Sequence, residues 1–309
     1  MTNISLLSRR EGKQELFFIS TIYNYISLLK PRVMSLSIFT SLVGMLIAPG
    51  KISLLHLFLA VLAISIGSGA AGALNMWYER DTDKLMERTK NRVLPLGLVS
   101  SKGALIFGIV LSVISVVLLY VVSNVLSAFL LALTIFYYIF VYTIWLKKKS
   151  PQNIVIGGAA GAFPPMIGWS VVTGTLSIEI CVIFILIFLW TPPHFWSLAL
   201  YKSDDYKKAG IPMMPLVVGN EKTVKMILYY SLSLIPTTII LSFYYSYFFT
   251  ISALILGSIF VYLSLNLRLF LNDEINFEKK AQNLFYFSII YLFNIFAIIL
   301  IDNLIWNSI

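Results

Sequence analysis

Oxygen-bearing side chains recur at a spacing of four residues in one stretch of the chain, at Asn75, Glu79 and Asp83. On an α-helix, residues at i, i+4 and i+8 lie on one face, so these three donors would be stacked above one another. Such oxygen donors suit a hard cation such as Mg²⁺, bound together with a phosphorylated ligand. Solvated charges at a helix end are the alternative interpretation. It explains Asn75 poorly, because Asn75 lies about one turn inside an apolar stretch, where an unpartnered polar group is unfavourable.

Basic residues follow this motif closely, with Arg88, Lys90 and Arg92 inside five positions. Beside acidic metal ligands they would form a site for an anion that the metal bridges, and diphosphate is the natural candidate. Lys90 alone is explained equally well by the excess of positive charge in cytoplasmic loops of membrane proteins. Both signs of charge in one short loop favour the metal–diphosphate site.

A second acidic motif, Asp204-Asp205, lies about 120 positions further along. Its flanking lysines are Lys202, Lys207 and Lys208. Two adjacent carboxylates are a weak signal by themselves. The first acidic motif lies at the end of the second apolar segment, and this second motif lies at the end of the sixth. The equivalent placement predicts an internal repeat and a shared site.

Two apolar segments contain proline pairs that predict kinks and space for a ligand. Small residues at 157–162 precede Pro164-Pro165, and His194 directly follows Pro192-Pro193. Small residues allow helices to approach closely in a membrane. An intramembrane histidine is as consistent with a hydrogen-bonded core residue as with a ligand-binding one.

The elements that must position these groups are membrane-spanning helices. Hydrophobic residues make up 59% of the 309 residues, mean hydropathy is +0.87, and charged residues are only 12%, against about 25% in soluble proteins. Nine segments are long enough to cross a bilayer. They are 33–49, 53–78, 103–122, 125–146, 153–173, 177–200, 223–243, 249–271 and 281–301. We therefore predict an all-α, polytopic membrane protein. It would have an N-terminal cytoplasmic segment, 1–30, and one membrane domain, 31–309, in which helices one to four and five to eight form the repeat and helix nine follows.

Charge predicts the orientation of this bundle. All lysines and arginines except Lys51 fall in the N-terminal segment and in alternate connections. The positive-inside rule therefore places the N-terminus in the cytoplasm and the C-terminus in the periplasm. The net charge of +9 has this explanation, and we expect no nucleic-acid partner. Cys181 is the only cysteine, so no intramolecular disulfide can form. We find no cleavable signal and no Arg-rich presequence, which favours a bacterial inner (cytoplasmic) membrane.

Three stretches carry a family resemblance: 75–95, Thr191-Pro-Pro-His-Phe-Trp196, and 204–215 with its Ala-Gly-Ile-Pro-Met-Met-Pro. Together they resemble the UbiA superfamily of intramembrane prenyltransferases, and in particular its heme branch. The resemblance implies a nine-helix bundle with a cavity at the cytoplasmic side. It also implies transfer of farnesyl from farnesyl diphosphate to a vinyl group of heme B with addition of water. The products would be diphosphate and heme O, the latter for heme–copper oxidase assembly.

The resemblance also implies residue roles. The implied catalytic residues are Asn75, Glu79, Asp83 and Asp205; the metal ligands are the same four with Asp204. The implied diphosphate-binding residues are Arg88, Lys90, Arg92, Lys202, Lys207 and Lys208; His194 and Trp196 would belong to the heme pocket. Two positions depart from the family pattern: Glu79 stands where aspartate is common, and Ala209 stands where relatives that make quinones have a second aspartate. Trp77, Trp169 and Trp196 are candidates to flank the allylic cation.

Other functions fit part of the same pattern. A related prenyltransferase with an aromatic acceptor such as 4-hydroxybenzoate would share the diphosphate site. A secondary transporter would also have repeats and broken helices, but its ionisable residues would lie near the membrane midplane. The expected partners are heme B, farnesyl diphosphate, the lipid bilayer and a downstream heme-modifying enzyme.

Overall fold

The computed structural model describes residues 19–306, which fold into helices with no strand in that range. The long elements are α2 (Pro31–Ile47), α3 (Leu54–Asp83), α4 (Ser101–Val122), α5 (Val125–Phe136) with the π-helix η1 (Tyr137–Leu146), α7 (Ala159–Thr173), α8 (Ile178–Tyr201), α11 (Asn220–Leu241), α12 (Tyr247–Leu269) and α13 (Glu274–Trp306). The short ones are α6 (Asn153–Gly157), α9 (Ser203–Lys208) and α10 (Met214–Val218). The all-α prediction is confirmed.

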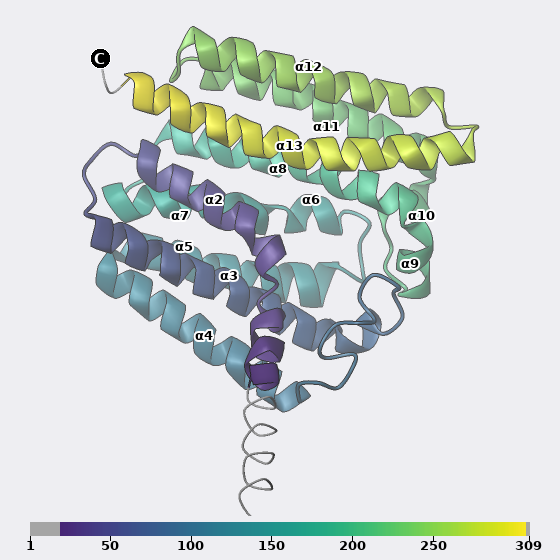
Figure 1. Cartoon of the computed structure of the whole chain (residues 1–309). Coiled ribbons are helices and arrows are strands. Elements are labelled where there is room, and N and C mark those ends of the chain that lie inside the picture. Colours follow the sequence, from purple (N-terminus) through teal and green to yellow (C-terminus); the bar gives the residue numbers. More distant parts are fainter. Residues whose placement is uncertain (1–18, 307–309) are drawn as a thin grey trace, which may run out of the picture.

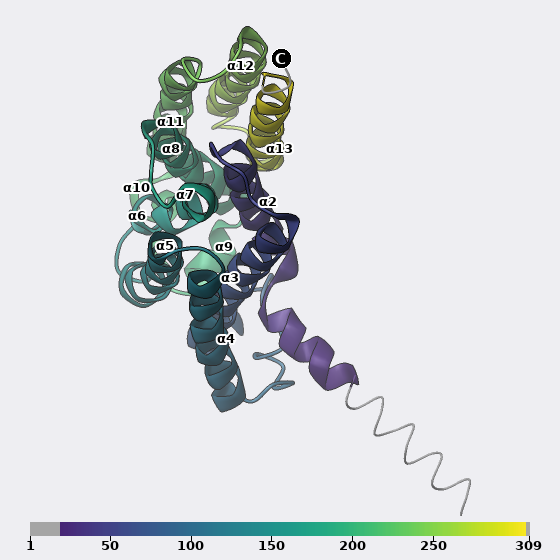
Figure 2. The same ribbon diagram turned by 90° about the vertical axis from the view of Figure 1, so that its left-hand side faces the viewer.

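The count of membrane spans agrees with the nine predicted segments. Eight helices of residues 19–306 are long and apolar enough to span, and a ninth is added if Ile19–Leu28 and α2, bent by 56°, count as one span. The chain is therefore a multi-pass membrane protein. Figure 2 shows the helix Ile19–Leu28 leaving the bundle at an angle to α2. The predicted cytoplasmic segment 1–30 lies within the described residues only from residue 19 onwards.

Serine and asparagine side chains mark where several helices begin, because they accept backbone N–H groups that the first turn leaves unpaired. The capping residues are Ser53, Ser100, Asn124, Ser177 and Ser246. Asn124 accepts from the backbone of Ser127 and also donates to the carbonyl of Ser170 at 2.7 Å. It thereby closes the α4–α5 turn and joins that turn to α7.

Helices α2 and α7 pack closely in the centre of the bundle (Figure 1). A Cβ added to Gly44 would lie 2.3 Å from the carbonyl oxygen of Pro165, and one added to Gly168 would lie 2.0 Å from that of Ser41. Only glycine allows the two backbones to approach so closely. Small residues thus allow close helix approach, but Gly44 and Gly168 both lie outside the stretch 157–162 for which this role was predicted.

The proline pairs lie inside α7 and α8 without interrupting either helix. The helical pattern of the fifth predicted segment is instead interrupted at Gly158, between α6 and α7. A Cβ on Gly157 would lie 2.1 Å from the Tyr142 ring, whereas one on Gly161 would meet nothing within 4 Å. Gly157 therefore permits close packing against η1, and Gly161 leaves space open.

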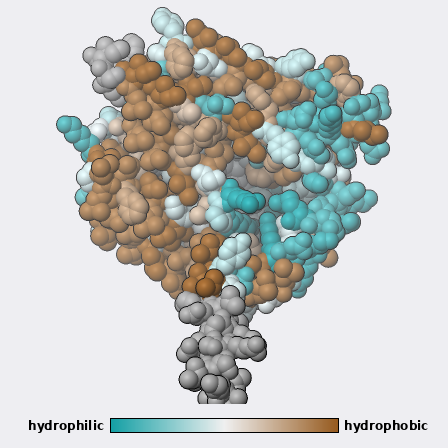
Figure 3. Space-filling view, viewed as in Figure 1, coloured by the Kyte–Doolittle hydropathy of each residue, from teal (hydrophilic) through white to brown (hydrophobic). Residues whose placement is uncertain are grey.

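The two halves of the chain pack in the same order. Helices α2, α3, α4 and α5 contact one another in sequence, as do α7, α8, α11 and α12. An internal repeat would produce this parallel, and the repeat itself stays a prediction. Hydrophilic residues gather at one end of the molecule (Figure 3), where Figure 1 places α9, α10 and the loop after α3.

Candidate active site

A cavity of about 410 Å³ opens between α2, α3, η1, α7 and α8. Its charged lining residues are Lys30, Glu79, Asp83, Arg88, Arg92 and Lys147. Four are basic and two acidic, so the polar end carries a formal excess of two positive charges. The remainder of the lining is largely apolar and aromatic. One cavity therefore combines an anion-attracting end with a hydrophobic end.

The acidic motif of α3 lies on one face, as its spacing predicts. Asn75, Glu79 and Asp83 are 2%, 6% and 2% exposed, and all three line the cavity. Asp81 points away, is exposed, and pairs with Lys84 at 3.1 Å. The alternative interpretation, a solvated charge at a helix end, therefore applies to Asp81 but not to Asn75, Glu79 or Asp83.

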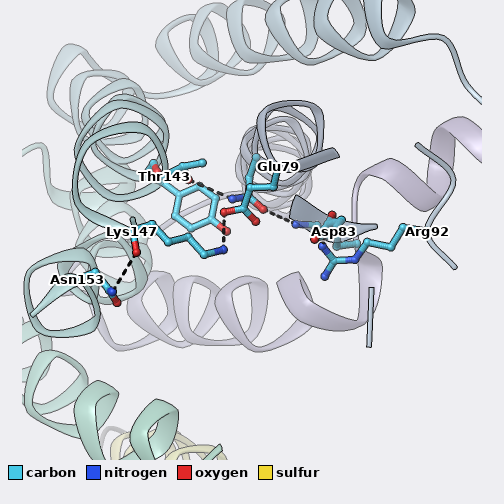
Figure 4. A network of polar contacts seen from close by, with 9 residues as sticks. Glu79, Asp83, Arg92, Thr143, Lys147 and Asn153 are labelled. Atoms are coloured by element: carbon cyan, nitrogen blue, oxygen red, sulfur yellow. Dashed lines mark hydrogen bonds and ion pairs between the residues drawn. The ribbon is translucent and has the colours of Figure 1, made fainter. Parts of the chain in front are cut away.

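Each buried carboxylate of this motif has a basic partner (Figure 4). Lys147, at the end of η1, donates to Glu79, and Arg92 Nη1 lies 2.8 Å from Asp83 Oδ2. Buried carboxylates are stable only with such compensation. The loop that carries Lys147 is fixed by Asn153, whose amide donates to the Lys147 carbonyl at 3.2 Å.

Asn75 also has two partners, which accounts for a polar residue so far inside the helix. Lys30 Nζ donates to Asn75 Oδ1 at 2.6 Å, and Asn75 Nδ2 donates to Thr143 Oγ1 at 3.1 Å. Lys30 is the only non-glycine residue with positive φ (53°) in the described part of the chain. A left-handed backbone costs about 1–2 kcal/mol for such residues, and such strain is typical of functional sites.

Sequence reasoning missed Lys30, Lys147 and the tyrosines of η1. Tyr138 and Tyr142 line the cavity, and their rings stack with centroids 5.5 Å apart. In a π-helix the bonds run from i to i+5, as from Lys147 N to the Tyr142 carbonyl at 2.9 Å. This wider turn brings Tyr138, Tyr142 and Lys147 to the same cavity. The available signal was Lys147 itself, one of three consecutive lysines after an aromatic segment.

The second acidic motif contacts the loop after α3. Neither Asp204 nor Asp205 is among the described residues that line the cavity. Asp205 accepts the backbone N–H of Glu87 and of Arg88 at 3.3 and 3.4 Å. Asp204 is exposed. The predicted meeting of the two loops is thus seen, with Asp205 bound to backbone and Asp204 turned to solvent.

The predicted diphosphate-binding residues divide into two groups. Arg88 and Arg92 line the cavity. Lys90 is exposed and pairs with Glu87. Lys202, Lys207 and Lys208 are exposed and are not among the described cavity-lining residues.

The apolar end of the cavity contains His194 but none of the three tryptophans proposed to flank the cation. Trp196 is fully buried on the other side of α8, where its ring packs edge-on against Tyr230. Trp77 contacts Arg80, and Trp169 is buried; neither is among the described lining residues. Residues two positions apart on an α-helix point to nearly opposite sides, so His194 faces the cavity and Trp196 is turned away from it. The aromatic lining comes instead from Trp190, Phe195, Tyr206 and the two tyrosines of η1.

The donor set fits a magnesium ion that shares its ligands with a phosphorylated substrate. No group of three or more His, Cys, Asp or Glu side chains is placed to hold a metal within residues 19–306. Glu79 and Asp83, with the amide oxygen of Asn75, offer three oxygen donors on one face. Mg²⁺ in proteins is commonly bound by one or two carboxylates plus substrate phosphates and water. The protein supplies the first part of that set.

Comparison with known proteins agrees with this geometry. The sequence profile of the UbiA prenyltransferase family matches residues 37–290. Protoheme IX farnesyltransferase of Bartonella bacilliformis is 52% identical over 302 residues, covering 97% of this chain and 96% of the relative. The protein of the same name from Pelagibacter ubique is 51% identical over 307 residues, covering 98% and 100%.

Solved structures show the same fold at low sequence identity. A digeranylgeranylglyceryl phosphate synthase matches with a TM-score of 0.75 and 15% identity, covering 92% of this chain and 98% of its own. A UbiA homologue from Archaeoglobus fulgidus, bound to GPP and Mg²⁺, matches with a TM-score of 0.62 and 18% identity, covering 89% and 99%. The chain therefore belongs to the UbiA prenyltransferase family, and within that family to the protoheme IX farnesyltransferases.

Proposed function

We propose that this enzyme transfers the farnesyl group of farnesyl diphosphate to a vinyl group of heme B, with addition of water, and releases heme O and diphosphate. The observation that carries the proposal is the single cavity that joins a basic, carboxylate-bearing end to an aromatic end containing His194. The names of the relatives, protoheme IX farnesyltransferase, describe a reaction that needs both ends.

Asn75, Glu79 and Asp83 would hold a magnesium ion, and Asp205 would steady the neighbouring loop. The ion, when bound, neutralises charge on the diphosphate oxygens and so assists departure of diphosphate as the leaving group. The Archaeoglobus fulgidus homologue, bound to GPP and Mg²⁺, supports such a metal.

The chain's own cations would bind the diphosphate. Arg88, Arg92, Lys30 and Lys147 all line the polar end. As the bond between the farnesyl carbon and the diphosphate oxygen breaks, negative charge grows on the leaving group. Positive groups already fixed around that charge stabilise the transition state.

The aromatic residues would protect the allylic cation that remains. Tyr138 and Tyr142 line the cavity with their rings stacked on each other, and aromatic ring faces attract positive charge. The apolar walls exclude water from the cation until it meets the vinyl carbon.

The decisive experiment is chromatography of heme extracted after incubation with farnesyl diphosphate and Mg²⁺. We expect heme B to be converted to heme O, with no product from 4-hydroxybenzoate. Unchanged heme B together with a prenylated aromatic acid would instead establish the quinone-precursor alternative. A transporter is not favoured, because the charged lining residues lie at helix ends rather than in the middle of the spans: Glu79 and Asp83 are in the last turns of α3, and Lys147 directly follows η1.

We further propose that the enzyme lies in the bacterial inner membrane with its polar end and N-terminus in the cytoplasm and its C-terminus in the periplasm. The distribution of lysine and arginine supports this orientation. A complex with a downstream heme-modifying enzyme would pass the poorly soluble product on, and co-purification from native membranes would test it.

A further inference from the structure

The imidazole of His194 is held by a serine on another helix. Its Nδ1 lies 2.6 Å from Ser288 Oγ, and Ser288 belongs to α13. Ser288 is fully buried. Among the described residues that line the cavity, His194 is present and Ser288 is not. The ring therefore has one nitrogen bonded behind the cavity wall, and Nε2 is the nitrogen left for the cavity.

The bonding of Ser288 determines where the histidine proton is. A serine hydroxyl has one proton to donate. Ser288 donates that proton to the carbonyl of Phe285 at 2.5 Å. When the hydroxyl proton is used in that bond, the Ser288 oxygen acts as the acceptor towards His194, and this arrangement assigns the ring proton to Nδ1. In a neutral imidazole the other nitrogen, Nε2, is then an unprotonated acceptor.

The ring is also fixed in its plane by aromatic neighbours. Trp190 stacks on one side with ring centroids 4.4 Å apart, and Phe285 lies 4.8 Å away with a 22° interplanar angle. Trp190 is itself tied to α13, because its indole N–H donates to the Ser288 carbonyl at 2.8 Å. Rotation of the imidazole would disturb both stacking contacts and the bond to Ser288.

We propose that Ser288 is a positioning residue that fixes His194 as the Nδ1-protonated tautomer, so that Nε2 can ligate the iron of the heme substrate. The inference rests on the proposed function, since it takes heme as the occupant of the aromatic end. Histidines that bind metal commonly donate their second N–H to an oxygen, which fixes the tautomer and makes the ligating nitrogen more basic. Ser288 provides that oxygen.

Resonance Raman spectroscopy of the full-length protein in lipid nanodiscs, loaded with ferrous heme B, tests the inference. The native protein should show an iron–histidine stretching band. Ser288→Ala should move this band to lower frequency and weaken heme affinity about tenfold, the lower end for loss of such a partner. Ser288→Thr, which keeps the hydroxyl, should return the band towards its native position. A merely structural role of Ser288 would not move this frequency.

His56 and Ser53 form a matched control. They are also a histidine and a serine joined at Nδ1, at 2.7 Å, but they lie exposed at the start of α3, at the other end of the bundle. His194→Gln should abolish the band and His56→Gln should leave it unchanged. Farnesyl diphosphate affinity, measured on each variant, confirms that the variant is folded.

The outcomes separate this inference from the proposed function. Conversion of heme B to heme O by the native protein, combined with an unchanged band in Ser288→Ala or His194→Gln, would overturn the inference and leave the function standing. Absence of both heme binding and conversion in the native protein would overturn the function, and the inference with it.

Discussion

Asp205 binds the backbone of Arg88: one carboxylate oxygen accepts the Arg88 N–H at 3.4 Å, and the other accepts the N–H of Glu87 at 3.3 Å. These bonds join α9 to the loop after α3 across more than a hundred positions of sequence. Arg88 lines the cavity and Asp205 lies behind it. The second acidic motif thus supports the first loop from outside.

We expect Asp205→Ala to lower turnover at least about tenfold, because hydrogen bonds involving a charged group contribute about 1.5–3 kcal/mol each. Asp205→Asn keeps one acceptor oxygen and should retain more activity. Steady-state kinetics with farnesyl diphosphate varied would measure both. Asp204→Ala, at the exposed neighbour, is the control and should behave as native. Native kinetics in Asp205→Ala would separate the second motif from the site.

Removal of an oxygen donor on α3, or of the negative charge that it carries, should abolish turnover without preventing membrane insertion. The variants are Asn75→Ala, Glu79→Gln and Asp83→Asn, read out by heme chromatography and by Mg²⁺ dependence of farnesyl diphosphate binding. The reason is that all three donors are buried on one face of the cavity. Asp81→Asn, an exposed residue of the same turn, should keep native activity. An active Asp83→Asn enzyme would contradict the metal-ligand assignment.

Lys147 and Lys30 should contribute to diphosphate affinity, although sequence reasoning did not select them. We expect Lys147→Met or Lys30→Met to raise the Kd of farnesyl diphosphate about tenfold, since loss of one charge-assisted hydrogen bond costs about 1.5 kcal/mol or more. Lys148→Met is a suitable control because Lys148 is adjacent and exposed. Calorimetry of the purified protein would measure all three. Equal affinity in every variant would remove both lysines from the binding site.

The proposed orientation can be tested by cysteine labelling in a Cys181→Ser background. A cysteine at position 90 should react only from the cytoplasmic side, since Lys90 lies exposed in the loop after α3. A cysteine at position 51 should react only from the periplasmic side, because Lys51 is exposed before the start of α3. Reversed labelling of the pair would invert the topology.

The contact between α2 and α7 should be sensitive to a single methyl group. A Cβ at position 168 would lie 2.0 Å from a backbone oxygen of α2, and overpacking of this kind costs about 1–3 kcal/mol. Gly168→Ala should therefore lower the Tm in detergent. Gly161→Ala, where a Cβ meets nothing within 4 Å, should leave the Tm unchanged. Equal Tm values would show that the helices separate easily.

Sequence patterns predicted the helices and the face of α3 well, because both depend on local periodicity. Asn75, Glu79 and Asp83 share a face simply because they are four residues apart. Lys30 and Lys147 could not be found this way, since each reaches α3 from a distant segment. Trp196 was assigned through its neighbour His194, but a helix turns side chains two residues apart to different sides. The tyrosines of η1 reach the cavity from a π-helix, and no local sequence pattern indicated its i to i+5 hydrogen bonds.

The ion pairs of Glu79 with Lys147 and of Asp83 with Arg92 have a thermodynamic consequence. A metal ion that takes either carboxylate must displace a lysine or an arginine, and this competition lowers its affinity for the empty enzyme. Bound diphosphate gives the displaced lysine and arginine a new anionic partner. Diphosphate therefore lowers the free-energy cost of metal binding, and the metal in turn frees these cations to bind diphosphate. Metal and farnesyl diphosphate should therefore bind with positive cooperativity, and each should raise the affinity of the other by the same factor.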